Sequence, residues 1–158
     1  MSDWKQFFRS LTDKVNTGIG VTDWFSIDQH ATDMYAALID DLDVMHNDPT
    51  WNRIDEFGGT IAIGSHSLCF VLGALNECGF PSVDHADVVH APTALHRVRF
   101  IRPLRVGHSI RVHTKLTAIH AESASSWLVD TEHTIERKDL DQPHLYAELQ
   151  NRYTLVEG

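Results

Sequence analysis

The stretch from residue 61 to residue 75 constrains the fold of this chain more than any other. Its sequence, IAIGSHSLCFVLGAL, puts apolar and small residues on every side of a helical wheel. A helix that is apolar all round is expected to be buried all round, so the rest of the chain has to cover it. The sequence therefore predicts one long buried helix at the centre of the domain.

After this helix the chain alternates between apolar and polar residues, with the period of two that is typical of strands. The alternation is clearest at residues 110–118 and 145–155, and residues 95–101 and 126–135 indicate two further strands. Residues 103–107 and 139–143 supply the turns between them. One buried helix followed by four antiparallel strands predicts an α+β protein of hot-dog arrangement, in which the sheet curls around the helix.

Two amphipathic helices are expected ahead of the buried one. Apolar residues recur at helical spacing at the start of the chain, namely Trp4, Phe7, Phe8, Leu11 and Val15. They predict a helix over residues 3–14. Ser26 with Gln29 matches a capping box and predicts a second helix that ends near Asp40. No repeat or linker divides the chain, so residues 1–158 are interpreted as one domain, with residues 1–20 as an N-terminal helical extension.

The composition is typical of a cytoplasmic globular protein. No apolar run approaches the ~20 residues of a membrane span, and the first residues lack the zones of a signal peptide. A net charge of −9 argues against a nucleic-acid partner. Cys69 and Cys78 are expected to be buried, reduced thiols. The eleven histidines show no metal-ligand spacing, so neither a metal ion nor a cofactor is expected.

Two short segments before the buried helix carry residue types suited to acid–base chemistry. Asp41 and His46 lie five positions apart, just past the second predicted helix, where Pro49 forces a turn. Gly64 stands at the start of the buried helix, whose first N–H groups lack partners within the helix and carry the positive end of its dipole. A proton-handling pair beside an anion-binding helix terminus is what the addition of water next to a carbonyl requires.

These segments resemble a known family. The pattern Asp41-x-x-x-x-His46 with Asp48-Pro49, followed by FGGTIAIG at residues 57–64 and an apolar helix, is similar to that of the MaoC-like dehydratases. These are (R)-specific enoyl-CoA hydratases of hot-dog fold, and the NodN-like subgroup looks most similar. Residues 95–107 (LHRVRFIRPLRVG) resemble the strand and turn that follow the central helix in that subgroup. The resemblance extends from about residue 24 to residue 153.

The resemblance implies a role for each of three catalytic candidates. Asp41 and His46 would bind and activate the water that adds across the double bond of a trans-2-enoyl thioester, and the backbone N–H of Gly64 would face the thioester oxygen. The candidate substrate-binding residues are Asp43, Phe57, Gly59, Ile63, Ser65, Arg97 and Arg99. The two arginines belong to a cluster of five within residues 97–111, which fits either a docking surface for the phosphates of coenzyme A or solvated strand faces.

Family members join two sheets edge to edge, which implies a homodimer or a dimer of dimers. Three positions depart from the family pattern. Asp43 replaces an Asn or Gln, Ile63 replaces a histidine, and Leu72 replaces the serine of simple hydratases. The Asp43 carboxylate is expected either to lie beside Asp41 or to point to solvent.

Three functions therefore stay open. The first is a hydratase or dehydratase that interconverts trans-2-enoyl and 3-hydroxyacyl thioesters of coenzyme A or of acyl carrier protein. The second is a hot-dog acyl thioesterase, although residues 65–76 lack the carboxylate that such enzymes carry on or near the helix. The third is a non-catalytic acyl-binding subunit, which the three departures favour. The sequence does not determine the acyl chain.

Overall fold

The computed structural model describes residues 4–51, 53–80 and 87–156. Three helices and two 3-10 turns precede or flank the central helix α4. The elements in chain order are α1 (Trp4–Ser10), η1 (Leu11–Lys14), β1 (Gly18–Val21), β2 (Phe25–Ser26), α2 (Gln29–Ile39), α3 (Val44–Asn47), η2 (Ile54–Glu56), α4 (Gly64–Glu77), β3 (Val88–Phe100), β4 (Ser109–Ala121), β5 (Ser126–Arg137) and β6 (Leu145–Leu155).

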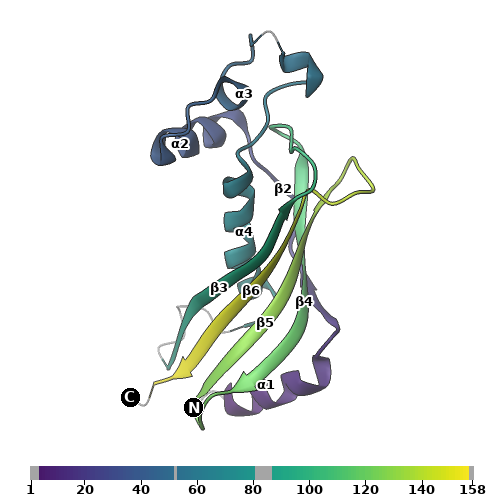
Figure 1. Cartoon of the computed structure of the whole chain (residues 1–158). Coiled ribbons are helices and arrows are strands. Elements are labelled where there is room, and N and C mark those ends of the chain that lie inside the picture. The colour runs from purple at the N-terminus through teal and green to yellow at the C-terminus, as the bar shows by residue number, and fades with distance from the viewer. Residues whose placement is uncertain (1–3, 52, 81–86, 157–158) are drawn as a thin grey trace.

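All these strands form one antiparallel sheet. Its order is β1-β4-β5-β6-β3, and β2 also pairs with β4. The four long strands were predicted from their alternation, whereas β1 and β2 were not, because each is too short to show a period. The sheet curves about α4 (Figure 1), so the predicted α+β hot-dog fold is confirmed.

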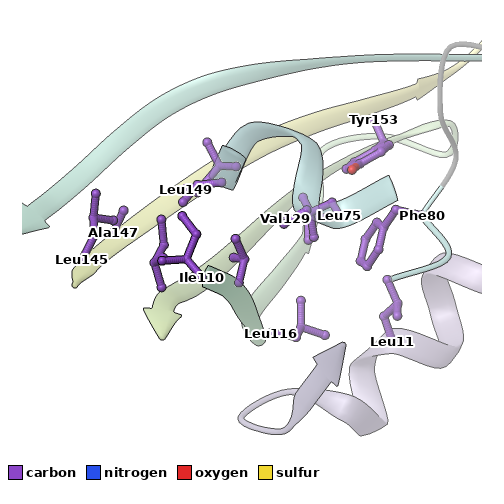
Figure 2. Packing of buried hydrophobic residues seen from close by; sticks show 14 of the residues in the cluster. Leu11, Leu75, Phe80, Ile110, Leu116, Val129, Leu145, Ala147, Leu149 and Tyr153 are labelled. Carbon is purple, nitrogen blue, oxygen red and sulfur yellow. The ribbon is translucent and has the colours of Figure 1, made fainter. Parts of the chain in front are cut away.

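The apolar core lies between the concave face of the sheet and α4. Every second residue of β5 is buried, from Trp127 to Arg137, and the intervening residues are half-buried on the outer face. Leu75 of α4 lies among core side chains from several strands, including Val129 and Leu149 (Figure 2). Phe8 of α1 stacks on Trp127 with 4.7 Å between ring centroids. The N-terminal segment is thus part of the core.

The central helix is buried on one side only. Its buried residues are Ser67, Val71, Ala74 and Leu75. Leu72 on the opposite flank is 41% exposed, so the prediction of burial all round is wrong for the single chain, because one sheet covers one side of the helix. Both cysteines are free, as predicted, but Cys69 is exposed and Cys78 is only half-buried.

The helix α4 begins at Gly64, as predicted from the glycine at this position. Residues 60–63, the extended segment, are not helical, because their backbone pairs with the loop between β3 and β4. Ala62 N donates to Leu104 O at 2.8 Å, and Val106 N donates to Thr60 O at 3.0 Å. Residues 29–63, the overhang, carry α2 and α3 beyond the N-terminal end of α4 (Figure 1). No helix among the described residues is long and apolar enough to cross a membrane.

Candidate active site

The side chain of His46 is held by the extended segment. Its Nδ1 lies 2.7 Å from the carbonyl oxygen of Ile61. A carbonyl oxygen only accepts hydrogen bonds, so Nδ1 carries a proton and donates it, and Nε2 has no hydrogen-bond partner among the described residues. Ile61 N in turn donates to Met45 O at 3.1 Å. Ile61, three positions before Gly64, therefore fixes both the ring of His46 and the neighbouring backbone at Met45.

Gln29 holds the backbone of His46 from the other side. Its Nε2 donates to His46 O at 2.7 Å, and its Oε1 accepts from Thr60 Oγ1 at 2.5 Å. The capping box predicted for Ser26 and Gln29 is wrong, because α2 begins at Gln29 and is capped by Asp28, which accepts from Ala31 N at 2.7 Å. Sequence analysis missed the contacts of Gln29 with His46 and Thr60, since these residues lie 17 and 31 positions further along the chain and leave no local signal.

Asp41 lies where α2 ends and the chain reverses. Asp40 adopts the left-handed conformation with φ 59°, and Asp41 N donates to Ala36 O at 3.0 Å, which closes the helix with an αL cap. Asp41 is half-buried. Its carboxylate has no hydrogen-bond partner in the part of the chain that the structure describes, so both oxygens are available to a water molecule or a ligand.

The N-terminus of α4 offers backbone donors. The N–H groups of His66 and Ser67 bond to Ile63 O, and Ile63 provides no side-chain cap. Those of Gly64 and Ser65, within the described residues, have no partner, and together with the helix dipole they favour a negative charge. Gly64 fits closely here, because a Cβ at this position would lie 2.8 Å from Cε1 of Phe100 and the exposed Phe100 ring would have to shift.

Aromatic rings line α4 just after this terminus. The His66 ring stacks on Tyr35 of α2 with centroids 4.4 Å apart and on Phe70 with centroids 5.7 Å apart. Burial lowers the pKa of His66, so the ring is neutral at pH 7 and behaves as part of an apolar wall. Ser65 lies at the start of this wall and contacts Tyr35. Sequence analysis did not single out Tyr35 or His66.

Asp43 takes the solvent-exposed position that was one of the two expectations, and its side chain also makes a local contact. It is the N-cap of α3, and its Oδ1 accepts from Met45 N at 3.1 Å. The residue is exposed. The carboxylate therefore supports the short helix that carries His46.

The other candidate substrate-binding residues are spread over three places. Ile63 and Ser65 flank Gly64, and Ile63 is buried. Phe57 stacks on Trp51 with centroids 6.2 Å apart, and Gly59 follows in the same loop, where its φ of 142° suits glycine alone.

The arginine cluster does not gather at the site. Arg97 lies in a bulge of β3 with φ 43° and pairs with Glu148 at 3.3 Å on the outer face of the sheet. Arg99 is exposed further along the same strand. The guanidinium of Arg105, in contrast, lies against Gly58 in the overhang. Of the arginines on β3 and its loop, Arg105 is thus the one that contacts the segment leading to the site.

The ion pair between Arg137 and Asp139 supports the loop behind the extended segment. Arg137 Nη1 donates to Pro103 O at 2.6 Å, next to the residues that pair with the extended segment. Hydrogen bonds from Arg137, whose side chain is 8% exposed, lower the pKa of Asp139 to about 2. The carboxylate is therefore ionised throughout the neutral range and keeps Arg137 in place.

Comparison with known proteins gives one family. The MaoC like domain family matches residues 11–136. Nodulation protein N of Rhizobium leguminosarum bv. viciae is 29% identical over 145 residues, which cover 91% of this chain and 87% of that protein. The match includes both the overhang and the sheet.

Solved structures share the fold. A monoamine oxidase regulatory protein from Archaeoglobus fulgius superimposes with a TM-score of 0.74 and 19% identity, over 90% of this chain and 92% of that one. An (R)-hydratase from A. caviae involved in PHA biosynthesis gives a TM-score of 0.68 and 15% identity, over 90% and 96% of the two chains. At these identities the likeness establishes the hot-dog fold.

Proposed function

Because the chain belongs to the MaoC-like domain family of hydratases and dehydratases, we propose that it adds water to a trans-2-enoyl thioester, or removes it from a 3-hydroxyacyl thioester. The observation that carries this proposal is the hydrogen bond from His46 Nδ1 to Ile61 O. It leaves Nε2 as the nitrogen that accepts a proton, on an element joined to the segment that leads into Gly64. The (R)-hydratase from A. caviae, which has the same fold, supports this class of reaction.

In the proposed reaction, Asp41 and His46 transfer protons and Gly64 stabilises negative charge. Water binds between the Asp41 carboxylate and His46 Nε2, and one of these groups takes its proton as the oxygen attacks the β-carbon. The electron pair of the double bond moves toward the thioester oxygen, where enolate charge develops. The N–H of Gly64 stabilises that charge. A proton then returns to the α-carbon from Asp41 or His46, so the sum is the addition of one water across the double bond.

The thioesterase alternative has less support. Such enzymes usually carry their carboxylate on or near the central helix, whereas the acid on α4, Glu77, is the last residue of the helix. At ~1.5 Å per residue it lies roughly 20 Å from Gly64. The non-catalytic alternative rests on the three departures from the family pattern, Asp43, Ile63 and Leu72, and it predicts binding of acyl thioester without turnover.

An assay with crotonyl-CoA separates these functions. Hydration removes the absorbance of the conjugated thioester without release of free thiol, whereas a thioesterase releases thiol. We expect loss of the conjugated band and no thiol signal. Purified protein that binds crotonyl-CoA but changes neither signal would contradict the enzymatic proposal and favour the acyl-binding subunit.

We further propose that the protein is a homodimer or a dimer of dimers that joins through β3. Within the described residues the outer edge of β3 has no neighbouring strand. Large apolar side chains are exposed along it, with Val89 57% and Leu95 42% exposed. Unpaired edges of this kind are normally covered. Light scattering should give at least twice the chain mass of 17.9 kDa, and a monomer at micromolar concentration would contradict the assembly.

A further inference from the structure

The side-chain amide of Gln29 makes three hydrogen bonds, two through Nε2 and one through Oε1. Its Nε2 donates both to His46 O at 2.7 Å and to Asp33 Oδ1 at 2.7 Å. Its Oε1 accepts from the hydroxyl of Thr60 at 2.5 Å. An amide with two donor hydrogens and one oxygen so engaged is restrained in position and in orientation.

The chemistry of the partners determines which end of the amide is which. A main-chain carbonyl and an ionised carboxylate can only accept, so the NH₂ group has to face His46 and Asp33. The Thr60 hydroxyl is then left to donate to Oε1. A rotated amide would place its oxygen against two acceptors, which is repulsive, and hence the observed orientation is the stable one.

Gln29 closes a ring of contacts around His46. The backbone of His46 is tied to Gln29, Gln29 is tied to Thr60, and Thr60 precedes Ile61, which accepts the proton on His46 Nδ1. The extended segment thus holds the His46 ring directly, through Ile61, and the His46 backbone indirectly, through Thr60 and Gln29. Displacement of His46 O from Gln29 would move the ring relative to Ile61 O.

We infer that Gln29 is a positioning residue that holds His46 in the orientation in which Nδ1 is protonated and Nε2 is free. A thiol, alkyl or hydroxyl side chain cannot make the same set of contacts, because none combines two donors with an acceptor in one plane. The expected effect on the reaction rate rests on the proposed function. The expected effect on the His46 tautomer is independent of the proposed function.

The test compares the wild-type protein with Gln29→Met, a substitution of similar length without polar atoms. In ¹⁵N-histidine-labelled protein, the His46 resonances are assigned by their loss in His46→Ala. We expect the wild-type ring above its titration range to be the Nδ1-protonated tautomer alone. In Gln29→Met we expect both tautomers to be populated, with kcat for crotonyl-CoA hydration reduced about tenfold, the factor equivalent to one hydrogen bond, and KM changed far less.

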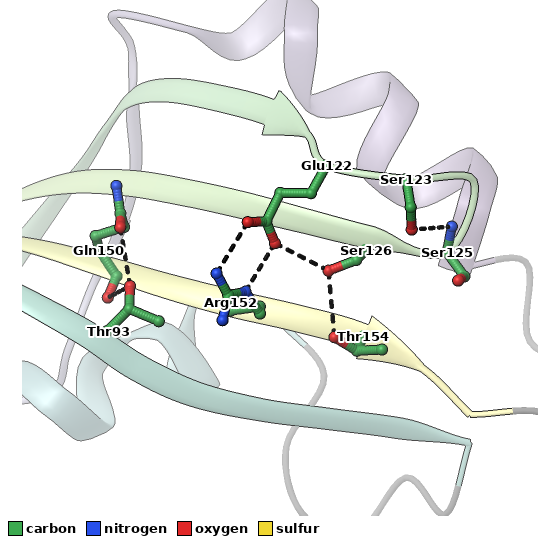
Figure 3. A network of polar contacts seen from close by, with 8 residues as sticks. All are labelled: Thr93, Glu122, Ser123, Ser125, Ser126, Gln150, Arg152 and Thr154. Atoms are coloured by element: carbon green, nitrogen blue, oxygen red, sulfur yellow. Dashed lines mark hydrogen bonds and ion pairs between the residues drawn. The ribbon is translucent and has the colours of Figure 1, made fainter.

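Gln150 offers a matched control on the outer face of the sheet. Its Oε1 accepts from Thr93 Oγ1 at 2.9 Å and its Nε2 donates to Asp130 Oδ1 at 2.8 Å, so it repeats the threonine and aspartate contacts of Gln29 without a histidine. Figure 3 shows the bond to Thr93. Gln150→Met should leave the His46 tautomer and kcat unchanged. A similar loss in both variants would indicate general destabilisation and overturn the inference.

A second variant covers the case in which Gln29→Met does not fold. Thr60→Val keeps the shape of the side chain and removes only the hydroxyl that restrains Oε1, so we expect the same changes in tautomer and kcat at smaller size. A single Nδ1-protonated tautomer in every folded variant would overturn the positioning role. Absence of hydration in the wild-type protein would instead overturn the proposed function, and the tautomer comparison would still decide the role of Gln29.

Discussion

The overhang and the sheet with α4 are stabilised by different interactions. Ile110, Val112 and Leu116 of β4 have no exposed surface, and full burial of such side chains contributes about 1.5–3 kcal/mol each. In the overhang, Leu38 is 80% exposed, and His46 is held by polar contacts to the backbone. A net hydrogen bond contributes only about 1 kcal/mol. The sheet with α4 therefore sets stability, and the overhang sets the geometry of the site.

Truncation of one leucine in each region gives the largest expected contrast. Leu116→Ala in the core should lower the free energy of unfolding by about 2–5 kcal/mol, because it leaves a cavity in a fully buried position. The matched variant Leu38→Ala, on the exposed face of α2, should stay within about 0.5 kcal/mol of wild type. Urea unfolding measures both. Equal losses would show that a partner or a second copy buries Leu38, and the division between the two regions would not hold.

Substitution of Asp41 or His46 should lower activity and leave stability close to wild type. Asp41→Asn and His46→Ala should each lower the hydration rate by ~10²-fold or more, the usual contribution of a general acid or base. Stability should stay near wild type, since neither side chain is fully buried and Asp41 has no partner among the described residues. Steady-state rates with crotonyl-CoA and thermal unfolding provide the two readings. Retention of most activity in either variant would mean that the pair is misassigned.

These two regions also differ in what the sequence could predict. The buried positions of β5 follow from alternation within the strand, and that local signal was sufficient. The start of α4 at Gly64 was predicted, but the pairing of Ile61 with Arg105, far along the chain, was not. A period within a segment contains no information about such a partner.

The site was predicted unevenly for the same reason. Asp41, His46 and Gly64 were identified from short segments and a family resemblance, and their catalytic roles stay predictions. Gln29 was misinterpreted as a capping residue, since its contacts with His46 and Thr60 depend on how α2, α3 and the extended segment pack. Phe100, which packs over Gly64, is likewise separated from it by most of α4 and β3.

A second histidine, His133, extends the comparison to the pH dependence of stability. His133 is fully buried in the sheet, with Nδ1 3.1 Å from Thr114 Oγ1 and Nε2 2.8 Å from Thr131 Oγ1, whereas Nε2 of His46 has no partner among the residues that the structure describes. Burial lowers the pKa of His133 from 6.5 to about 4. Above pH 6.5 neither the folded nor the unfolded state binds this proton, and stability is unaffected. Between pH 6.5 and pH 4 only the unfolded state binds it, so stability falls as pH falls.

We expect the free energy of unfolding to decrease by about 2 kcal/mol between pH 7.5 and pH 5 through this group. His133→Gln keeps partners for both threonines and does not titrate, so its pH dependence should be weaker by that amount. The low pKa of Asp139, about 2, keeps that carboxylate out of this interval. An identical pH dependence in the variant and the wild type would show that His133 is protonated in the folded protein.

The smallest expected effects are at Asp43, where the overhang departs from the family pattern. Asn is as good an N-cap as Asp, so Asp43→Asn should preserve the bond to Met45 N and leave both stability and hydration rate close to wild type. Asp43→Ala removes the cap and should cost about 0.5–1 kcal/mol, with a modest loss of activity because α3 carries His46. Parallel urea unfolding and crotonyl-CoA assays on the two variants measure this. A large loss of activity in a stable Asp43→Asn protein would show that this carboxylate, rather than that of Asp41, carries the proton transfer.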